Sequence, residues 1–297
     1  MFSVFIRVFV LTVTALQQLL YGVILGIVQG ISEWLPISSK TQVLIVSTYL
    51  FNLSFSDAYA FGLFMEIGTI LAAVIYFRKE LWSLIQVLAR QGDKESKTLF
   101  KYVLVCTVFT GIVAAPLFLY IDSISGTYNI GVPMLIMGII LILDALIIKY
   151  SRSKYGIDSN RKTLDQMSLK DYVLVGIAQG IAALPGVSRS GVTTSSLLLL
   201  NVEVKEAFRL SFIAMIFATS GAVALTYIAT RASIMATIAQ LGLGGLIVAI
   251  IVATIVSLLL IDFLLDIARK SSVVYLTAAL GIIALVSGTF AALYGIA

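Results

Sequence analysis

Long stretches without charged side chains limit the folds open to this sequence. Between Tyr102 and Ile121 no residue is charged, and a helix of about 20 apolar residues crosses the roughly 30 Å hydrocarbon core of a bilayer. Comparable apolar stretches cover Ala58–Phe77, Ile130–Lys149, Val204–Thr230, Leu241–Ala268 and Ser271–Ala297. The pattern predicts an all-α polytopic membrane protein with six transmembrane helices.

Composition supports a membrane protein. Of 297 residues, 60% are hydrophobic and 12% are charged, with a mean hydropathy of +1.07, whereas soluble domains carry about 25% charged residues. The net charge of +5 is concentrated in loops, above all Arg78–Lys101 and Ser151–Asp171. Two spans separate these loops, so both can lie on the cytoplasmic side, as the positive-inside rule requires. The basic character therefore indicates topology, and we expect no nucleic-acid partner.

Two residue types exclude whole classes of chemistry. The chain contains no histidine, which excludes a His nucleophile, a His general base and His metal ligands. The single cysteine, Cys106, cannot form an internal disulfide and is expected to be a packing residue. Asp144, Asp262 and Asp266 lie within a turn or two of basic loop residues, and we expect them to be anchors at the membrane interface.

A motif near the N-terminus recurs 150 positions later. Gly26–Ser39 has the sequence GIVQGISEWLPISS, and Gly176–Ser190 has GIAQGIAALPGVSRS. In each copy a Pro disfavours continuation of an apolar helix, and hydroxyl side chains follow that can cap a new one. The helices expected around the second copy, Tyr172–Leu184 and Val192–Asn201, are too short to cross a membrane. We therefore predict a re-entrant helix–loop–helix hairpin at each copy.

Each half of the chain then contains one re-entrant hairpin and three spans. Because three is odd, the second half enters the membrane in the opposite orientation. This predicts an inverted-topology repeat within a single integral membrane domain, residues 1–297, with halves at about 17–149 and 171–297. The segment up to Gln29 can be one bent helix or an extension followed by a helix from about Leu19; the sequence allows both.

The second copy carries a positive charge at membrane depth. Arg189 lies among three hydroxyl side chains, Ser188, Ser190 and Thr193. A guanidinium suits a phosphate, and the N–H groups of a helix N-terminus favour an anion. An intramembrane Arg is by default a candidate functional residue, although it could instead snorkel or bridge carbonyl groups between hairpins. We predict that this loop binds a phosphate.

The first copy supplies a carboxylate. Gln29 and Glu33 are four residues apart, hence on one helix face, and Glu33 is at the end of its helix, where the dipole favours a cation. Ser38, Ser39 and Lys40 follow, mirroring the hydroxyls and Arg of the second copy. The alternative is that Glu33 only caps the helix or fixes its topology.

Glu66 is the other acidic residue at membrane depth. It lies mid-span in the sequence FGLFMEIGTI, so it is either a functional carboxylate held charged by a metal or an Arg, or a neutral, hydrogen-bonded core residue. Oxygen ligands suit Mg²⁺ or Ca²⁺. We predict a divalent cation, Mg²⁺ or Ca²⁺, bound by Glu33 and Glu66.

Together these residues resemble the undecaprenyl-diphosphate phosphatase family, the bacitracin-resistance membrane phosphatases. The resemblance is carried by GIVQGISEWLPISS, by the stretch Phe61–Phe77 and by LPGVSRSGVT at Leu184–Thr193, and the helix order is similar over essentially the whole chain. It implies hydrolysis of a polyprenyl diphosphate to the monophosphate and inorganic phosphate, with a divalent cation, for recycling of a lipid carrier. It also implies a plasma-membrane location with the active site facing the extracytoplasmic side. Whether the chain forms a homodimer is left open.

The sequence departs from the family's pattern at a few positions. The family usually has Glu in place of Gln29, His in place of Gln42 and Gly in place of Thr41. Glu66 falls where bacterial relatives commonly have Gln. A Glu/Gln exchange between positions 29 and 66 would keep the number of carboxylates, if both side chains face one cavity. The departures make an archaeal-type carrier plausible, and the sequence does not distinguish undecaprenyl from dolichyl carriers.

The leading hypothesis is a metal-assisted phosphatase. Ser39 attacks the terminal phosphorus or orients a water, Glu33 binds the cation or acts as general base, and Arg189 stabilises the transferring phosphoryl group. The expected substrate-binding residues are Gln29, Ser38, Lys40, Ser188, Ser190 and Thr193. The lipid tail would occupy a side cleft between spans. The alternatives are a transporter or flippase of polyprenyl phosphate, because such proteins often share this architecture, and a non-catalytic protein that binds lipid phosphates.

Overall fold

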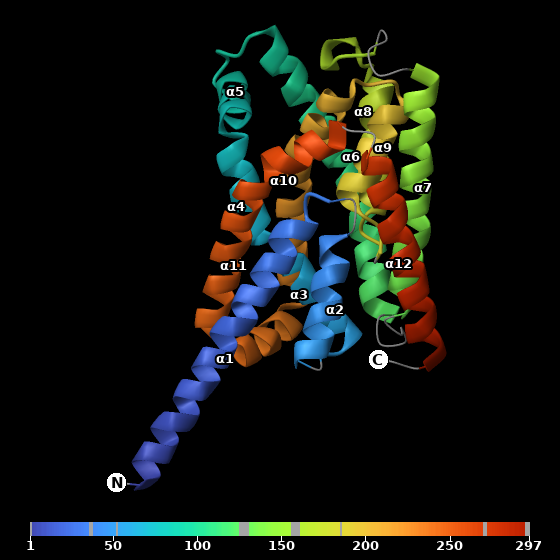
Figure 1. The fold of residues 1–297 in the computed structure, drawn as a ribbon. Helices are drawn as coiled ribbons and strands as arrows, with labels where there is room; N and C mark the ends of the chain where they lie inside the picture. Colours follow the sequence, from blue (N-terminus) through green and yellow to red (C-terminus); the bar gives the residue numbers. More distant parts are fainter. Residues whose placement is uncertain are drawn as a thin grey trace.

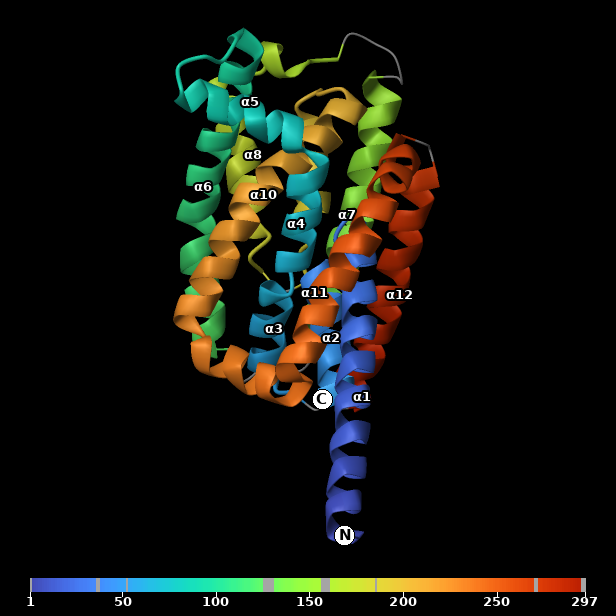
Figure 2. The ribbon, with the colours of Figure 1, turned by 90° about the vertical axis from the view of Figure 1, so that its left-hand side faces the viewer.

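The computed structural model describes residues 2–35, 38–51, 53–124, 131–155, 161–184, 186–269 and 272–294, which form a helical bundle (Figures 1 and 2). Within these ranges the β structure is limited to one isolated bridge between Lys162 and Val202. The helices are α1 (Phe2–Ser32), α2 (Ser39–Phe51), α3 (Phe55–Phe64), α4 (Ile67–Tyr76), α5 (Arg78–Leu88), α6 (Lys94–Ile124), α7 (Gly131–Tyr155), η2 (Leu164–Gln166), α8 (Leu169–Ile181), α9 (Arg189–Leu199), α10 (Val204–Ala229), α11 (Arg231–Arg269) and α12 (Ser272–Tyr294).

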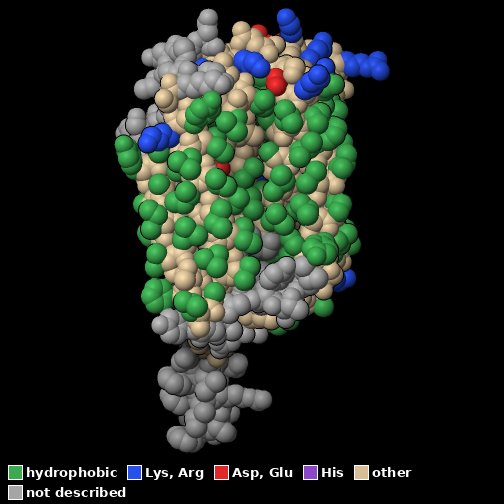
Figure 3. Space-filling model, turned by 90° about the vertical axis from the view of Figure 1, so that its right-hand side faces the viewer, with side chains coloured by type: hydrophobic (Ala, Val, Ile, Leu, Met, Phe, Trp, Pro, Cys, Tyr) green, Lys and Arg blue, Asp and Glu red, His purple; other side chains and the backbone are tan. Residues whose placement is uncertain are grey.

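The helices suit a membrane environment. The described segments long and apolar enough to cross a bilayer are Thr14–Ser32, Asp57–Tyr76, Lys94–Ile121, Val204–Ala229 and Leu241–Phe263. Figure 3 shows a broad band of apolar side chains, with Lys and Arg gathered at the end that also carries α5 and η2, here called the basic end. The chain is therefore an all-helical polytopic membrane protein. The predicted boundaries Ile130, Ser271 and Ala297 lie outside the described residues.

Two helix pairs reverse direction inside the bundle. α1 runs from the opposite end toward the middle and α2 returns to that end, whereas α8 starts at the basic end and α9 returns to it (Figure 1). We call these pairs the first hairpin and the second hairpin. α9 has 11 residues, or roughly 16 Å of helix, which is too short to cross a bilayer. Its start is fixed by Ser188, whose Oγ accepts a hydrogen bond from Gly191 N at 3.2 Å. Pro36 and Pro185 lie outside the described residues.

The N-terminal part of the chain forms one continuous helix. α1 extends from Phe2 to Ser32, which answers the question left open between a single helix and a separate extension before Leu19. Figure 1 shows its N-terminal part reaching beyond the other helices.

Each hairpin packs on a long helix of the other half of the chain. α1 lies along α11, and α8 lies along α6. The repeated glycines Gly26 and Gly176 permit the close approach, because a Cβ would stand 2.6 Å from Ala249 O and 2.7 Å from Cys106 O, respectively. Cys106 is fully buried at this contact, as a packing residue should be. The remaining pair, α7 and α12, also lie side by side.

Two elements differ from the sequence expectation. The predicted continuous span at Ala58–Phe77 is divided into α3 and α4, with Met65 and Glu66 at the division. Asp144 was expected at the membrane interface, but it is 3% exposed on α7, and its Oδ2 lies against α9, 2.4 Å from the position a Gly191 Cβ would take. That prediction was wrong because sequence distance from the basic loop does not reveal the neighbouring hairpin.

Packed apolar side chains fill the part of the bundle near the basic end. The largest core cluster joins residues of α4, α6, α8, α9 and α10 on that side. Trp34, the residue after Glu33, marks its inner limit, and its ring meets Phe212 edge to face at 4.9 Å between centroids. Packed apolar side chains therefore surround Trp34 on this side of the hairpin turns.

Candidate active site

The two hairpin turns and the division between α3 and α4 meet in the middle of the bundle. Glu33 directly follows α1, Ser39 is the first residue of α2, Arg189 is the first residue of α9, and Glu66 lies between α3 and α4. Their residue exposures are 4% for Glu33, 6% for Ser39 and 2% for Glu66. The fold therefore brings together side chains that are as much as 156 positions apart.

Glu33 is the centre of this group because it accepts three side-chain hydrogen bonds. Ser39 Oγ donates to Oε2 at 2.6 Å, and Gln29 Nε2 donates to the same oxygen at 2.9 Å. Arg189 Nη2 donates to Oε1 at 2.6 Å. The Ser39 hydroxyl thus lies within proton-transfer distance of a carboxylate whose other oxygen is held by a cation. A hydroxyl bonded to a carboxylate that a third group orients has the geometry that activation of a nucleophile requires.

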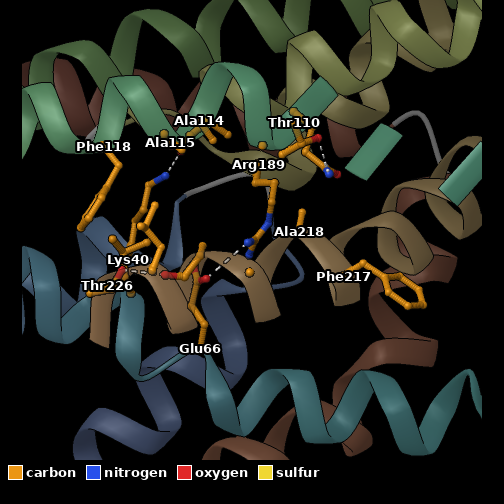
Figure 4. Close-up of a pocket in the computed structure, with 18 of the residues that line it drawn as sticks. Lys40, Glu66, Thr110, Ala114, Ala115, Phe118, Arg189, Phe217, Ala218 and Thr226 are labelled. Carbon is orange, nitrogen blue, oxygen red and sulfur yellow. Dashed lines mark hydrogen bonds and ion pairs between the residues drawn. The ribbon is translucent and has the colours of Figure 1, made fainter. Parts of the chain in front are cut away.

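Arg189 joins the two buried carboxylates. Its Nη1 lies 3.3 Å from Glu66 Oε2 while Nη2 binds Glu33, and Figure 4 shows Arg189 and Glu66 pointing toward each other. A buried charge is tolerated only when it is paired and hydrogen-bonded. Glu66 therefore has the Arg neighbour that would keep it charged, and its predicted role as a metal ligand stays a prediction.

Thr69 connects Gln29 with the backbone of Glu66. Gln29 Nε2 also donates to Thr69 Oγ1 at 3.3 Å, and Thr69 Oγ1 donates to the backbone oxygen of Glu66 at 2.8 Å. A single Thr side chain thus links the two positions at which this chain exchanges Glu and Gln relative to the family's pattern. The link ends on the backbone oxygen of Glu66 and not on its carboxylate, and Gln29 lines neither of the two cavities described below, so the Glu/Gln exchange stays a prediction.

The loop hydroxyls hold the two turns together. Ser38 has a φ of 56°, a conformation that costs a non-glycine residue energy, and its Oγ lies 2.9 Å from Thr41 Oγ1. Gly186 N of the second turn donates to the same Thr41 oxygen at 3.1 Å. Ser190 Oγ donates to Leu35 O at 3.3 Å. These contacts fix the relative position of the α2 and α9 N-termini.

Two cavities meet at this group. The first, here called the polar cavity, has a volume of about 10 Å³, enough for roughly one water. The second, the apolar cavity, has a volume of about 200 Å³ and lies between α6 and α10 (Figure 4). Gly111 and Gly221 are among the residues that line it. Lys40, Glu66 and Arg189 line both. The polar cavity is also lined by Glu33, Ser38, Ser39, Ser188 and Ser190.

Nearly all predicted site residues therefore converge. Gln29 contacts the group through its hydrogen bonds to Glu33 and Thr69. Neither Gln29 nor Thr193 lines a cavity, and Thr193 is fully buried on α9. Gln42, which stands where the family usually has His, donates through Nε2 to Met137 Sδ of α7 at 3.5 Å.

The oxygen donors of this group fit a hard divalent cation. Glu33 and Glu66 approach the same guanidinium, and Gln29 Oε1 is buried without a partner. Carboxylate and amide oxygens are ligands that Mg²⁺ and Ca²⁺ accept. Within the described ranges, however, three or more His, Cys, Asp or Glu residues do not cluster as a metal site anywhere, so a cation here would need oxygens from a ligand or water as well.

Sequence reasoning missed the small residues that open the apolar cavity. A Cβ added at Gly111 or Gly221 would meet nothing within 4 Å, and Ala114, Ala115 and Ala218 also line this space. The clustering of small residues on α6 and α10 was the available signal. It was ambiguous because small residues also serve close helix packing in membranes.

Comparison with known proteins places the chain in a family. The model of the bacitracin resistance protein BacA family matches residues 22–286. Proteins named undecaprenyl-diphosphatase are similar over nearly their whole length. The identity is 49% for that of Saccharolobus solfataricus (92% of this chain, 96% of the relative), 45% for Sulfurisphaera tokodaii (91% and 97%) and 38% for Pyrobaculum aerophilum (89% and 95%). This chain therefore belongs to the bacitracin resistance protein BacA family.

Proposed function

We propose that this chain is a polyprenyl-diphosphate phosphatase that converts an undecaprenyl- or dolichyl-type diphosphate to the monophosphate and inorganic phosphate. The observation that carries the proposal is the 2.6 Å hydrogen bond from Ser39 to Glu33, with Arg189 on the other carboxylate oxygen. Curated relatives of up to 50% identity are named undecaprenyl-diphosphatase, so transport without hydrolysis is not favoured. The same activity would recycle a lipid carrier of the cell envelope, and the family name connects it with bacitracin resistance.

The reaction begins at Ser39. Its Oγ attacks the terminal phosphorus and its proton passes to Glu33. The bond between that phosphorus and the bridging oxygen breaks, and the monophosphate leaves with the electron pair and takes up the proton. Water then attacks the phosphoserine, restores the Ser39 hydroxyl and releases inorganic phosphate. In the variant left open by the sequence, Ser39 instead orients a water for direct attack; acid quenching during turnover separates the two, because only the first traps phosphoserine.

Charge stabilisation is the larger part of phosphoryl transfer. Arg189 carries donors suited to a phosphate, and it lies at the N-terminus of α9 opposite the N-terminus of α2, where helix dipoles favour an anion. To bind substrate, its guanidinium would share or release the carboxylates of Glu33 and Glu66. Ser38, Ser188 and Ser190 line the same polar cavity and would position the phosphate oxygens.

A divalent cation, Mg²⁺ or Ca²⁺, would be held by Glu33 and Glu66, with Gln29 Oε1 as a further oxygen. Bound there, it would neutralise phosphate charge. The charges at the site support a bound cation. The two negative charges of Glu33 and Glu66 equal the two positive charges of Lys40 and Arg189, so the negative charge of a diphosphate would have no counter-charge from the protein.

The apolar cavity is suited to the prenyl tail. Its walls on α6 run from Thr107 to Phe118 and on α10 from Phe217 to Thr226, which are the parts of both helices farther from the basic end (Figure 1). With the basic end in the cytoplasm, the cleft and the site open toward the extracytoplasmic side of the plasma membrane. The finer architecture that we propose has six spans and two re-entrant hairpins in an inverted repeat. The matching contacts of α1 with α11 and of α8 with α6 support it.

The test is phosphate release from farnesyl diphosphate by the purified full-length protein in detergent, with Mg²⁺ or Ca²⁺. We expect cation-dependent release that Arg189→Ala and Ser39→Ala abolish. Absence of release by the parent protein with either cation, together with movement of polyprenyl phosphate across vesicles, would establish the transporter instead.

A further inference from the structure

Lys40 occupies the junction between the two cavities. It lines the polar cavity together with Ser39 and Arg189, and it also lines the apolar cavity. In a prenyl diphosphate, one phosphate is terminal and the other, here called the proximal phosphate, joins it to the tail. If the terminal phosphate lies at Ser39 and the tail lies between α6 and α10, the proximal phosphate must pass this junction.

The Lys40 ammonium is buried but not neutralised by a contact. Its residue exposure is 5%, and Nζ donates to the backbone oxygen of Ala182 at the end of α8. Over the described part of the chain it forms no ion pair, whereas Arg189 contacts two carboxylates. An ammonium has three donors, so two remain after the bond to Ala182. A buried ammonium with two unused donors is suited to an anion that can accept hydrogen bonds from them.

The surroundings hold this ammonium in place. Tyr59 OH donates to the backbone oxygen of Ala183, beside the carbonyl that Lys40 uses, and both Tyr59 and Ala183 line the apolar cavity. The carbonyl of Ala182, directly after α8, thus holds Lys40 from one side, and Lys40 also lines the apolar cavity. Figure 4 shows Lys40 and Arg189 entering this space from different elements.

We propose that Lys40 forms a separate subsite for the proximal phosphate. The inference rests on the proposed phosphatase function. In the reaction, the bond from the terminal phosphorus to the bridging oxygen breaks, and the charge that develops on the leaving monophosphate lies beside the Lys40 ammonium. The same contact binds the prenyl monophosphate product. It also makes prenyl diphosphates, whose proximal phosphate reaches the junction, better substrates than simple phosphate esters.

The two subsites can be separated by the inhibitors that fill them. Orthovanadate mimics the terminal phosphate and needs Arg189 and Ser39. Farnesyl monophosphate carries the proximal phosphate and the tail, and farnesol carries the tail alone. Inhibition constants of all three are measured against hydrolysis of farnesyl diphosphate by the parent protein and by Lys40→Met, Lys40→Arg and Lys97→Met, the last changing an exposed lysine of the basic end.

For Lys40→Met we expect the inhibition constant of farnesyl monophosphate to rise at least tenfold, because a charge-assisted hydrogen bond is lost. The constants for orthovanadate and farnesol should stay within about twofold. Lys40→Arg should recover most of the monophosphate affinity, and Lys97→Met should match the parent.

A purely structural role, in which Lys40 only caps α8, gives a different result. In Lys40→Met, the inhibition constants of all three compounds would then rise together and thermal stability would fall, or none of the three constants would change. Either outcome overturns the proposal. Failure of the proposed function is distinct, because the parent protein would then release no phosphate. If Lys40→Met releases too little phosphate to assay, the binding of farnesyl monophosphate and of farnesol is measured directly by thermal shift and gives the same comparison.

Discussion

Exchanging Glu33 for Gln tests the central contact of the site. The substitution keeps the shape but removes the proton acceptor for Ser39, which donates to Glu33 at 2.6 Å. Loss of a general base typically costs a factor of 10² to 10⁴, which corresponds to about 3–5 kcal/mol in the barrier. The expected result for Glu33→Gln is therefore a kcat for prenyl diphosphate lowered by about two to four orders of magnitude.

The stability cost of the same substitution should be smaller. Arg189 keeps Glu66 as a carboxylate partner, and one amide oxygen can still accept from Arg189. The new NH₂ group would meet the donor of Gln29, which now binds Glu33 at 2.9 Å. One mispaired buried group of this kind costs about 1–3 kcal/mol, and thermal unfolding of the purified protein in detergent measures it.

Glu66→Gln provides the matched control. It removes the same charge from the same Arg189, whereas the hydrogen bond of Ser39 is to Glu33 and is left intact. Phosphate release is measured for both variants with saturating cation and farnesyl diphosphate. Because the cation is saturating and Arg189 keeps its contact with Glu33, we expect Glu66→Gln to stay within about tenfold of the parent. If it falls as far as Glu33→Gln, or if Glu33→Gln itself stays within tenfold, then charge balance around Arg189, and not a base at Glu33, determines the rate.

Three further outcomes are expected. Gly111→Phe or Gly221→Phe fills open space in the apolar cavity, so the KM for undecaprenyl diphosphate should rise about tenfold, while that for dimethylallyl diphosphate should not change. Ser188→Ala removes the cap that accepts from Gly191 N; it should lower the free energy of unfolding by about 1 kcal/mol and reduce phosphate release less than Arg189→Ala does. Chelation of divalent cations should stop hydrolysis reversibly, and Glu66→Gln should raise the cation concentration needed for half-maximal phosphate release; equal requirements in both proteins would exclude Glu66 as a ligand.

The helical framework was largely predictable from the sequence because bilayer thickness and backbone hydrogen bonding leave few alternatives. The reversals of direction at α1–α2 and at α8–α9 coincide with the two copies of the repeated motif, and the re-entrant insertion of both pairs stays a prediction. The division of Ala58–Phe77 at Glu66 was not predictable, since Gly62 and Gly68 lie on either side without marking a break. At this division Glu66 forms an ion pair with Arg189, a tertiary contact that the local sequence does not reveal.

The candidate site was predictable as a set of residue types but not as a network. A spacing of four suggested that Gln29 and Glu33 share a helix face, and they do form a hydrogen bond. The Thr69 hydroxyl that extends this contact is 40 positions away, and the Lys40 contact with Ala182 spans 142 positions. Such pairs depend on how the halves dock, which hydropathy does not encode. Asp144 was misplaced for the same reason.

The Trp34–Phe212 contact and the core beyond it fill the bundle toward the basic end. If the site works as proposed, headgroup, water and released phosphate all pass through the remaining openings, on one face of the membrane. Each turnover then shortens the headgroup of a lipid and leaves that lipid in the leaflet from which it came. The enzyme would change how many carriers are ready for use without changing how they are divided between the leaflets, and their return across the bilayer would be a separate step.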